Sequence, residues 1–161
     1  MIIVVFGLPG SGKSYFASRL ALHTKAEYLN SDQLRIKMFK KRDYSDEEKK
    51  AVYDALFDKA KKAAKRNTSL VIDATFYKQE LRQQYLDEFD ENVFFIEVVA
   101  NKRLIKKRMS TTRAFSEADF KVHKNLKKEW EPFEQKHLVL ESTNDNIGEM
   151  IDKAMLYLPK R

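Results

Sequence analysis

A glycine-rich segment near the start of the chain carries the clearest chemical signal in the sequence. Residues 7–14 read Gly-Leu-Pro-Gly-Ser-Gly-Lys-Ser and match the P-loop pattern G-x-x-x-x-G-K-[ST]. Glycines let the backbone fold around a phosphate so that successive N–H groups point inward. In this pattern Lys13 reaches the β- and γ-phosphates of a nucleoside triphosphate, and the Ser14 hydroxyl contacts Mg²⁺. The segment therefore predicts a site for ATP and Mg²⁺.

The residues on either side supply the strand and the helix that this loop requires. The apolar run 2–6 is typical of a buried strand, and residues 15–22 begin an amphipathic helix. The N-terminus of that helix adds a positive field at the phosphates. The candidate nucleotide-binding residues are Gly7, Pro9, Gly10, Ser11, Gly12, Lys13, Ser14 and Tyr15.

Two charged residues after the second expected strand have the chemistry of an acceptor site. Asp32 and Arg35 are three positions apart and share one face of a first helical turn. The Asp32 carboxylate can orient an acceptor hydroxyl and take its proton as the bond to phosphorus forms. Arg35 can hold an anionic group on the acceptor. An aspartate also simply favours a helix N-terminus, but its place after a P-loop, a helix and a strand favours a catalytic role.

Asp73 is the candidate metal ligand, together with Ser14. It ends the apolar run 70–72, at the position where a second acidic residue of P-loop proteins holds Mg²⁺ directly or through water. Thr75 follows and could support it. The alternative is an ordinary strand-end aspartate in a turn.

Residues 98–116 contain no acidic side chain. The end of this stretch, about 108–116, is polar and predicts a basic lid that closes over the triphosphate. There Arg108 and Arg113 would bring positive charge to the transferred phosphoryl group. We expect most of 102–107 to be a solvated basic helix.

The chain is basic, with a net charge of +7 and a pI of about 9.4. This favours an acidic partner such as nucleic acid or a phosphorylated substrate, although a solvated basic surface has the same charge. Phe39 and Tyr44 could stack on bases beside a second basic cluster that could contact a phosphate backbone. That cluster consists of Lys37, Lys40, Lys41 and Arg42. The histidines lack ligand-like spacing, and we expect all three, at positions 23, 123 and 137, to lie outside the site.

Length and composition limit the class of protein. The 161 residues indicate one domain over 1–161 with a proper core, since 43% are hydrophobic. The absence of cysteine excludes disulfides and thiolate metal sites. No apolar run approaches the roughly 20 residues that span a bilayer. The apolar N-terminus lacks the basic region of a signal peptide, so we expect a cytoplasmic, ATP-using protein without a membrane partner.

Strand and helix patterns alternate along the chain, which predicts an α/β fold with a parallel sheet between two layers of helices. In such sheets ligands bind beyond the carboxyl ends of the strands. We expect strands at 2–6, 27–29, 69–73, 92–100 and 137–140. We expect helices from 15 to about 23, from 31 or 32 onward, and at 45–66, 78–89, 102–108, 116–131 and 147–158.

These motifs occur in an order that resembles the P-loop kinases of the polynucleotide 5′-hydroxyl kinase type and related small ATP-binding kinases. The resemblance rests on the 7–14 octapeptide, Ser31-Asp32-x-x-Arg35, Val71-Ile72-Asp73-Ala74-Thr75, and Arg108 with Arg113. It implies a P-loop kinase-like three-layer sandwich with a five-stranded parallel sheet. It also implies that Lys13 and Ser14 bind ATP and Mg²⁺, that Asp32 is the general base, and that Arg35 meets the acceptor. The chain departs from that family at Phe76, where an amide is usual, and in the five-residue spacing of the two lid arginines.

The resemblance implies an ATP-dependent phosphotransferase that moves the γ-phosphoryl group to a hydroxyl. The first expectation for the acceptor is the 5′-OH end of an oligonucleotide. The alternative is a small metabolite, an antibiotic or a nucleotide sugar. A second alternative is a nucleotide-dependent switch ATPase without an acceptor, which would not need the Asp32 and Arg35 pair.

Overall fold

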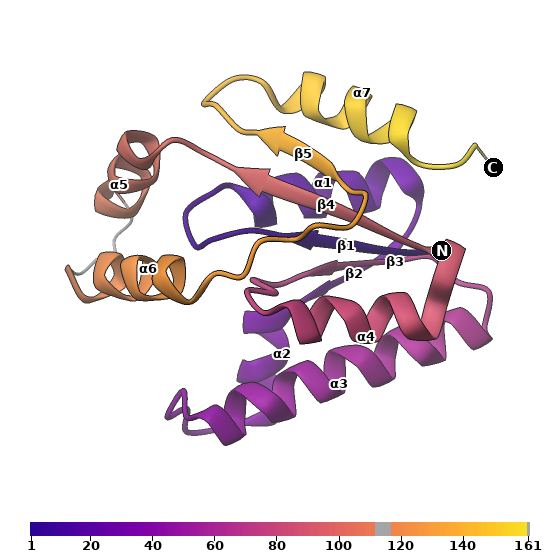
Figure 1. Cartoon of the computed structure of the whole chain (residues 1–161), viewed down its shortest axis with the longest axis horizontal. Coiled ribbons are helices and arrows are strands. Elements are labelled where there is room, and N and C mark those ends of the chain that lie inside the picture. Colours follow the sequence, from indigo (N-terminus) through magenta and orange to yellow (C-terminus); the bar gives the residue numbers. More distant parts are fainter. Residues whose placement is uncertain (112–116, 161) are drawn as a thin grey trace.

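A sheet of five parallel strands forms the centre of the molecule, in the order β2-β3-β1-β4-β5 (Figure 1). The computed structural model describes residues 1–111 and 117–160, and side chains are described throughout except at 117–120. The strands are β1 (Ile2–Phe6), β2 (Glu27–Asn30), β3 (Leu70–Asp73), β4 (Val93–Val99) and β5 (Leu138–Glu141). β1 lies at the centre and pairs with β3 and β4, so the loop that follows it emerges from the middle of the sheet.

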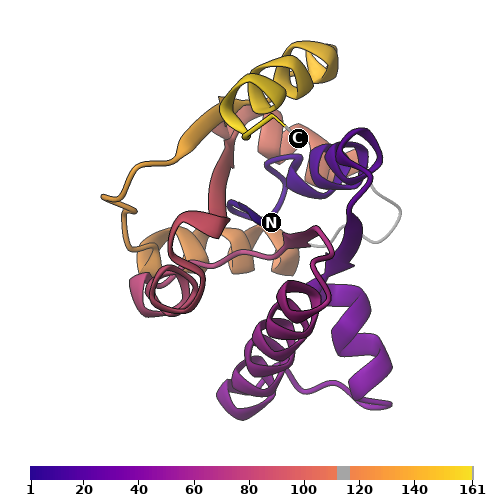
Figure 2. The same ribbon diagram turned by 90° about the vertical axis from the view of Figure 1, so that its right-hand side faces the viewer.

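Helices cover both faces of this sheet and make three layers (Figures 1 and 2). One face carries α1 (Lys13–Thr24) and α7 (Ile147–Tyr157), and the other carries α2 (Ser31–Met38), α3 (Asp46–Lys65) and α4 (Gln79–Phe89). A short 3₁₀ turn, η1 (Asp90–Asn92), joins α4 to β4. Two further helices, α5 (Lys102–Thr111) and α6 (Glu117–Glu129), lie beyond the carboxyl ends of the strands.

Alternating side chains along β1 divide the core into two parts. Ile3 and Val5 belong to the cluster with α1 and α7, whereas Ile2, Val4 and Phe6 belong to the cluster with α3 and α4. Every residue of β1 is buried, as expected of a central parallel strand that is covered on both sides. Phe6 also stacks on Trp130, with 6.0 Å between ring centroids, which joins the segment after α6 to the core.

The expected fold class is confirmed, with each expected strand and helix found within a few residues of its bounds. The lid differs from expectation, because residues 108–111 are helical and belong to α5. The Asn101 side chain accepts a hydrogen bond from the Leu104 N–H, 2.8 Å away, and starts this helix. The rest of the expected lid, 112–116 with Arg113, lies outside the described residues. In the described part of the chain, no helix has the length and apolar character needed to cross a membrane.

Candidate active site

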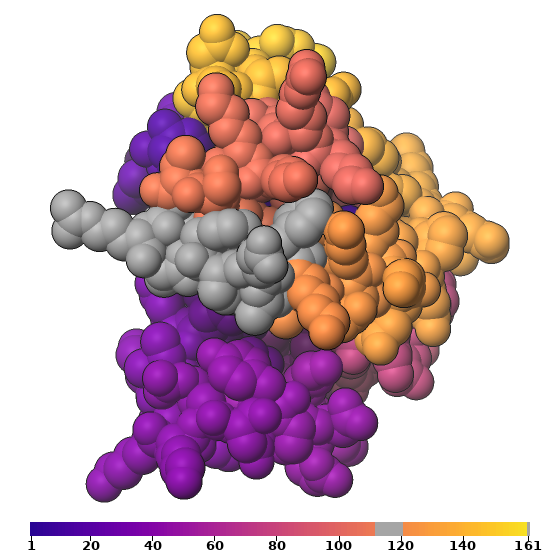
Figure 3. Space-filling model, turned by 90° about the vertical axis from the view of Figure 1, so that its left-hand side faces the viewer, coloured from indigo at the N-terminus to yellow at the C-terminus, as the bar shows by residue number. Residues whose placement is uncertain are grey.

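A cavity of about 920 Å³ lies at the carboxyl ends of β1, β2 and β3. Figure 3 looks onto this end of the molecule, with α5 above and α2 and the start of α3 below. The cavity brings together all the described residues that the sequence suggested for catalysis or metal binding. These are Lys13, Ser14, Asp32, Arg35, Asp73 and Arg108. Among the nucleotide-binding candidates, it is also lined by Pro9, Gly10, Gly12 and Tyr15.

The P-loop has the backbone that its glycines allow. Gly12 precedes α1 with a φ of 89°, where L side chains rarely fit. A Cβ atom at Gly12 would lie 3.1 Å from Ser142 Oγ and 3.2 Å from Arg108 Nη1. Gly7 lines no part of the cavity, and a Cβ there would overlap the Val98 carbonyl oxygen. Gly7 thus permits close packing of the loop against β4.

Distant side chains hold the P-loop from behind. Ser11 is buried, and its carbonyl oxygen accepts a hydrogen bond from Ser142 Oγ at 2.6 Å. Arg108 Nη1 donates to the same Ser142 Oγ at 2.9 Å and to the Gly10 carbonyl at 3.3 Å, and its Nη2 donates to the Thr143 carbonyl at 2.9 Å. Burial lowers the pKa of the Arg108 guanidinium from its ordinary value. Arg108 therefore lies on a helix and braces the P-loop, where the sequence suggested a residue on an open lid.

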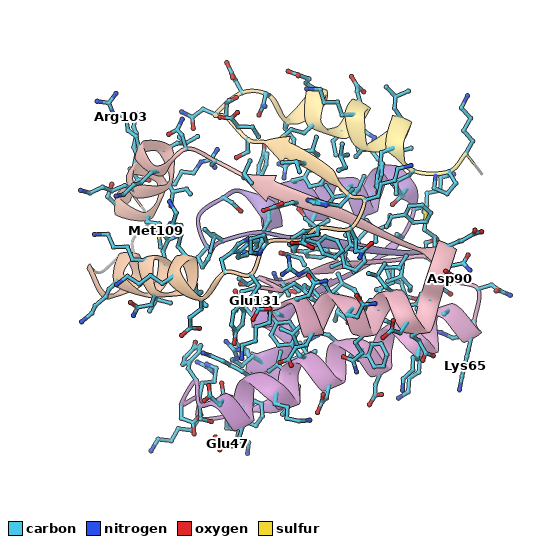
Figure 4. The ribbon with its side chains drawn as sticks, in the orientation of Figure 1. Glu47, Lys65, Asp90, Arg103, Met109 and Glu131 are labelled. Carbon is cyan, nitrogen blue, oxygen red and sulfur yellow. The ribbon has the colours of Figure 1, made fainter. Side chains whose placement is uncertain are left out.

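α5 packs directly on the loop through its apolar side. A Cβ at Gly10 would lie 2.9 Å from Ile105 Cγ2 and 3.3 Å from Met109 Cγ. Met109 lies on the side of α5 toward α6, whereas Arg103 projects away from the molecule (Figure 4). The basic residues at 102, 103, 106 and 107 are exposed, as expected of a solvated helix face.

His123 contacts the P-loop from outside the cavity, whose lining contains none of the three histidines. Its Nδ1 lies 2.9 Å from the Pro9 carbonyl oxygen, which implies the tautomer in which Nδ1 carries the proton and donates it. His123 is buried, and desolvation is the main reason that its pKa is lowered from the usual value. No local pattern indicates this contact, since 114 positions separate the two residues.

Asp73 is fully buried, and one of its oxygens has a hydrogen-bonding capacity that the described residues leave unused. Its Oδ2 accepts from Tyr28 Oη at 2.8 Å and from Asn30 Nδ2 at 2.6 Å, while its Oδ1 has no hydrogen-bond partner among the described residues. Burial, followed by the charge of Asp73, raises the pKa of Tyr28 and keeps its phenol protonated. Ser14 and Asp73 both line the cavity.

These contacts fit a magnesium site between Ser14 and Asp73. A buried carboxylate oxygen without a partner is costly unless an ion or water satisfies it. Mg²⁺ is commonly held by one or two carboxylates together with substrate phosphates. The described residues contain no cluster of three or more acidic or histidine side chains that would form a cation cage by itself.

On the other side of the cavity, Arg35 is fixed and Asp32 is free. Arg35 Nε lies 3.2 Å from the buried Glu48 Oε1, an ion pair whose angle does not allow a linear hydrogen bond. The Arg35 guanidinium lies over the Tyr44 ring, 4.8 Å from its centroid. The Asp32 side chain is 81% exposed, and its Oδ1 lies 4.0 Å from Arg35 Nη1. This leaves the Asp32 carboxylate open to a ligand in the cavity.

The second basic cluster does not reach the cavity. Lys37, Lys40, Lys41 and Arg42 are absent from its lining. Phe39 packs against the hydrophobic core, so the expectation that it offers a stacking surface is wrong. Tyr44 does line the cavity and is 58% exposed.

Several residues of the site gave no sequence signal that singled them out. Asn30 and Tyr28 hold Asp73 because β2 pairs with β3 in a register that sets Asn30 beside Asp73. Asn30 also caps α2, since its Oδ1 accepts the Gln33 N–H at 3.0 Å. Glu48 lies in the first turn of α3, where its N–H donates to the capping Ser45 Oγ at 3.2 Å, and its side chain forms the ion pair with Arg35. Strand register and helix packing would have been needed to find these partners.

A family model described as an AAA domain matches residues 2–133. No curated protein matches the chain. Among solved structures, a sugar kinase from Janibacter sp. HTCC2649 has a TM-score of 0.75 and 21% identity, covering 97% of this chain and 92% of its own. A gluconokinase from Sinorhizobium meliloti 1021 has a TM-score of 0.72 and 18% identity, covering 96% and 89%. Similarity at this level establishes a shared fold.

Proposed function

Because the chain belongs to the AAA domain family, with a model match over residues 2–133, we propose that it is an ATP-dependent kinase that phosphorylates a hydroxyl of a small molecule. One observation carries the proposal. A single cavity is lined by Lys13, Ser14 and Asp73 on one side and by Asp32 and Arg35 on the other. The set with Lys13 suits the phosphates of a nucleoside triphosphate and its metal ion. The pair Asp32 and Arg35 suits an acceptor that loses a proton and carries a negative group.

On the donor side, the P-loop backbone and Lys13 would hold the β- and γ-phosphates in place. Ser14 and the free Oδ1 of Asp73 would hold Mg²⁺, which neutralises charge on those phosphates when it is bound. The bracing of the loop by Ser142 and Arg108 keeps these donors preorganised, so that little reorganisation is needed during transfer.

On the acceptor side, Asp32 would accept the proton of the attacking hydroxyl. Oxygen–phosphorus bond formation and cleavage of the bond to the β-phosphate then leave ADP and a phosphorylated acceptor, with the proton on an Asp32 carboxylate oxygen. Arg35 would orient the acceptor, because Glu48 and Tyr44 fix its guanidinium at the cavity wall. A switch ATPase would need neither group.

A small acceptor is favoured over an oligonucleotide end. The cavity of about 920 Å³ includes the P-loop side, so ATP and the acceptor would share a volume within the range of about 300–1,000 Å³ that is typical of small-molecule pockets. The two solved structures compared above are described as a sugar kinase and a gluconokinase. The basic cluster that suggested a nucleic acid partner lines none of the cavity.

The test is an incubation with γ-labelled ATP and Mg²⁺ in three arms: a mixture of sugars and sugar acids, a 5′-OH oligonucleotide, and no acceptor. We expect label on a member of the sugar mixture. Label on the oligonucleotide alone would establish the polynucleotide acceptor instead. Free phosphate formed at one rate in all three arms would support the switch ATPase and overturn the kinase proposal.

A further inference from the structure

We propose that Lys49 and Tyr53, one turn apart on α3, form the acceptor subsite and restrict the acceptor to a hydroxylated small molecule that carries an anionic group. Residues four apart on a helix face the same side, and both of these line the cavity. Arg35 and Asp32 line the same cavity from α2. This inference rests on the proposed kinase function, because it assigns a ligand to the acceptor side of the same cavity.

Lys49 supplies a positive charge that the described residues do not neutralise. Arg35 has an ion pair with Glu48 at 3.2 Å, and the neighbouring Lys50 pairs with Asp54 at 2.6 Å. Lys49 has no ion pair among the described side chains, although Glu129 also lines the cavity. A cavity cation without a protein partner suits a ligand that brings a negative charge of its own.

Tyr53 supplies a hydrogen-bond donor whose position is fixed by the backbone beyond β3. Its Oη accepts the Phe76 N–H at 3.0 Å. Phe76 has a φ of 47°, unusual for a residue with a side chain, and its ring is fully buried against Tyr53 and Tyr85 at centroid distances of 5.3 and 5.4 Å. The Phe76 N–H points at Tyr53, and the Phe76 side chain turns into the core. An amide side chain is usual at this position in the kinase family that the sequence resembles.

The Tyr53 hydroxyl therefore has its own proton left to donate. It makes no other hydrogen bond with the described residues. Burial is the main cause that raises the pKa of Tyr53, so the phenol stays protonated near neutral pH. An O–H donor close to an ammonium group is suited to the oxygens of a carboxylate or phosphate, since charge-assisted hydrogen bonds are the stronger ones.

The experiment measures acceptor binding by calorimetry with the P-loop filled by Mg²⁺ and a non-hydrolysable ATP analogue. The probes are D-gluconate, D-glucose 6-phosphate and D-glucose, which separate a carboxylate, a phosphate and a neutral sugar. We expect at least one anionic probe to bind and D-glucose to bind at least tenfold more weakly. Lys49→Met should weaken the anionic probe about 10- to 100-fold, and Tyr53→Phe on the order of tenfold.

Each variant has a matched control on the same part of the molecule. Lys50→Met removes the same charge from the next position of α3, where the side chain is 77% exposed and lines no part of the cavity. Tyr85→Phe removes the hydroxyl of the other tyrosine that packs on Phe76, and that hydroxyl is buried without a described partner. Both controls should bind probes and ATP analogue as the unmodified protein does. In turnover, Lys49→Met and Tyr53→Phe should raise the acceptor KM and leave the ATP KM unchanged.

The subsite is overturned if D-glucose binds as tightly as the anionic probes, if neither anionic probe binds, or if Lys49→Met binds them with unchanged affinity. Failure of the kinase function gives a different result. In that case the anionic probe binds, Lys49→Met weakens it, and no label is transferred to it from ATP. If both variants transfer label with an unchanged acceptor KM, the kinase function stands and the proposed subsite is overturned.

Discussion

The nucleotide side and the acceptor side of the cavity are built in different ways. The nucleotide side comes mainly from one continuous segment, 9–15, that follows the central strand. The acceptor side is assembled from α2 and α3, with Tyr53 held by the segment after β3, and these parts are separate in the sequence. A local motif fixes the chemistry of the first side, whereas the tertiary fold decides which side chains meet on the second.

Even the nucleotide side depends on distant contacts for its shape. Ser142, Arg108 and His123 all hydrogen-bond carbonyl groups of the P-loop from segments about 100 or more positions away. Substitutions within the P-loop motif should therefore abolish ATP binding or turnover. Substitutions of the distant contacts should reduce these quantities only partly.

The largest effect should come from Lys13→Ala. This removes the ammonium that would contact the β- and γ-phosphates, and we expect a loss of turnover of at least 10²- to 10³-fold with weaker ATP binding. Steady-state kinetics and ATP titration measure both. Lys25→Ala, at the C-cap of α1 and outside the cavity, is the control and should leave both quantities unchanged. Unchanged ATP affinity in Lys13→Ala would break the assignment of the nucleotide side.

Asp73→Asn should act through the metal. The amide keeps the shape of the side chain but lacks the charge of the carboxylate, so we expect the Mg²⁺ concentration for half-maximal rate to rise on the order of tenfold or more. A magnesium titration of the rate measures this effect. Ser69→Ala, at a buried residue beside the opposite end of β3, should leave the magnesium requirement unchanged. An identical titration curve for Asp73→Asn would remove Asp73 from the metal site.

Glu48→Gln sharpens the comparison on the acceptor side. The change leaves the Arg35 guanidinium without its buried ion partner, and the cost should be about 2–3 kcal/mol of unfolding free energy, less than for a fully buried pair because Arg35 reaches the cavity. Urea unfolding measures the loss, and the acceptor KM should rise while the ATP KM stays constant. Glu47→Gln, on the exposed side of the same turn, is the matched control. A rise confined to the ATP KM would move Arg35 to the donor side.

A smaller effect should come from the pH dependence at His123. Burial lowers its folded-state pKa, so the unfolded chain takes up the proton first as the pH falls below about 6.5. Folding stability should therefore be full above that pH and decline below it. His123→Asn should flatten this part of the stability curve, measured by urea unfolding between pH 8 and 5. A slope identical in the variant would contradict the role of His123.

The sequence was most informative where one element sufficed. A local pattern was enough for the strand at 2–6, the glycine-rich loop at 7–12 and the aspartate at the end of β3. The structure has both strands, and the loop and Asp73 line one cavity. Fold class followed from the alternation of strands and helices, because that alternation constrains connectivity strongly. Phe39 and the helical 108–111 were misjudged, and the contact of His123 with the P-loop was missed, since each depends on a partner that is distant in sequence. Phe39 packs on a core built from α3 and α4, and α5 is held on Gly10 by Ile105 and Met109.

The acceptor side could be predicted only in part. Asp32 and Arg35 could be proposed from the sequence because three-residue spacing at a helix start is visible there, and both line the cavity. Lys49 and Tyr53 lie in a long amphipathic helix where the sequence does not distinguish cavity positions from surface positions. Their place in the cavity depends on how α3 packs beside the segment after β3. The hydrogen bond from the Phe76 N–H to the Tyr53 hydroxyl is one contact between these two parts.

The most direct test of the two-sided cavity is to measure ATP affinity and label transfer together in Asp32→Asn. The variant removes the open carboxylate and leaves the P-loop intact. The control is Asp58→Asn on α3, where the side chain is 64% exposed. We expect ATP to bind as it does to the unmodified protein and transfer to fall about 10²- to 10⁴-fold. Near-native transfer in Asp32→Asn would contradict the assignment of the acceptor side, and lost ATP binding would contradict the separation of the two sides.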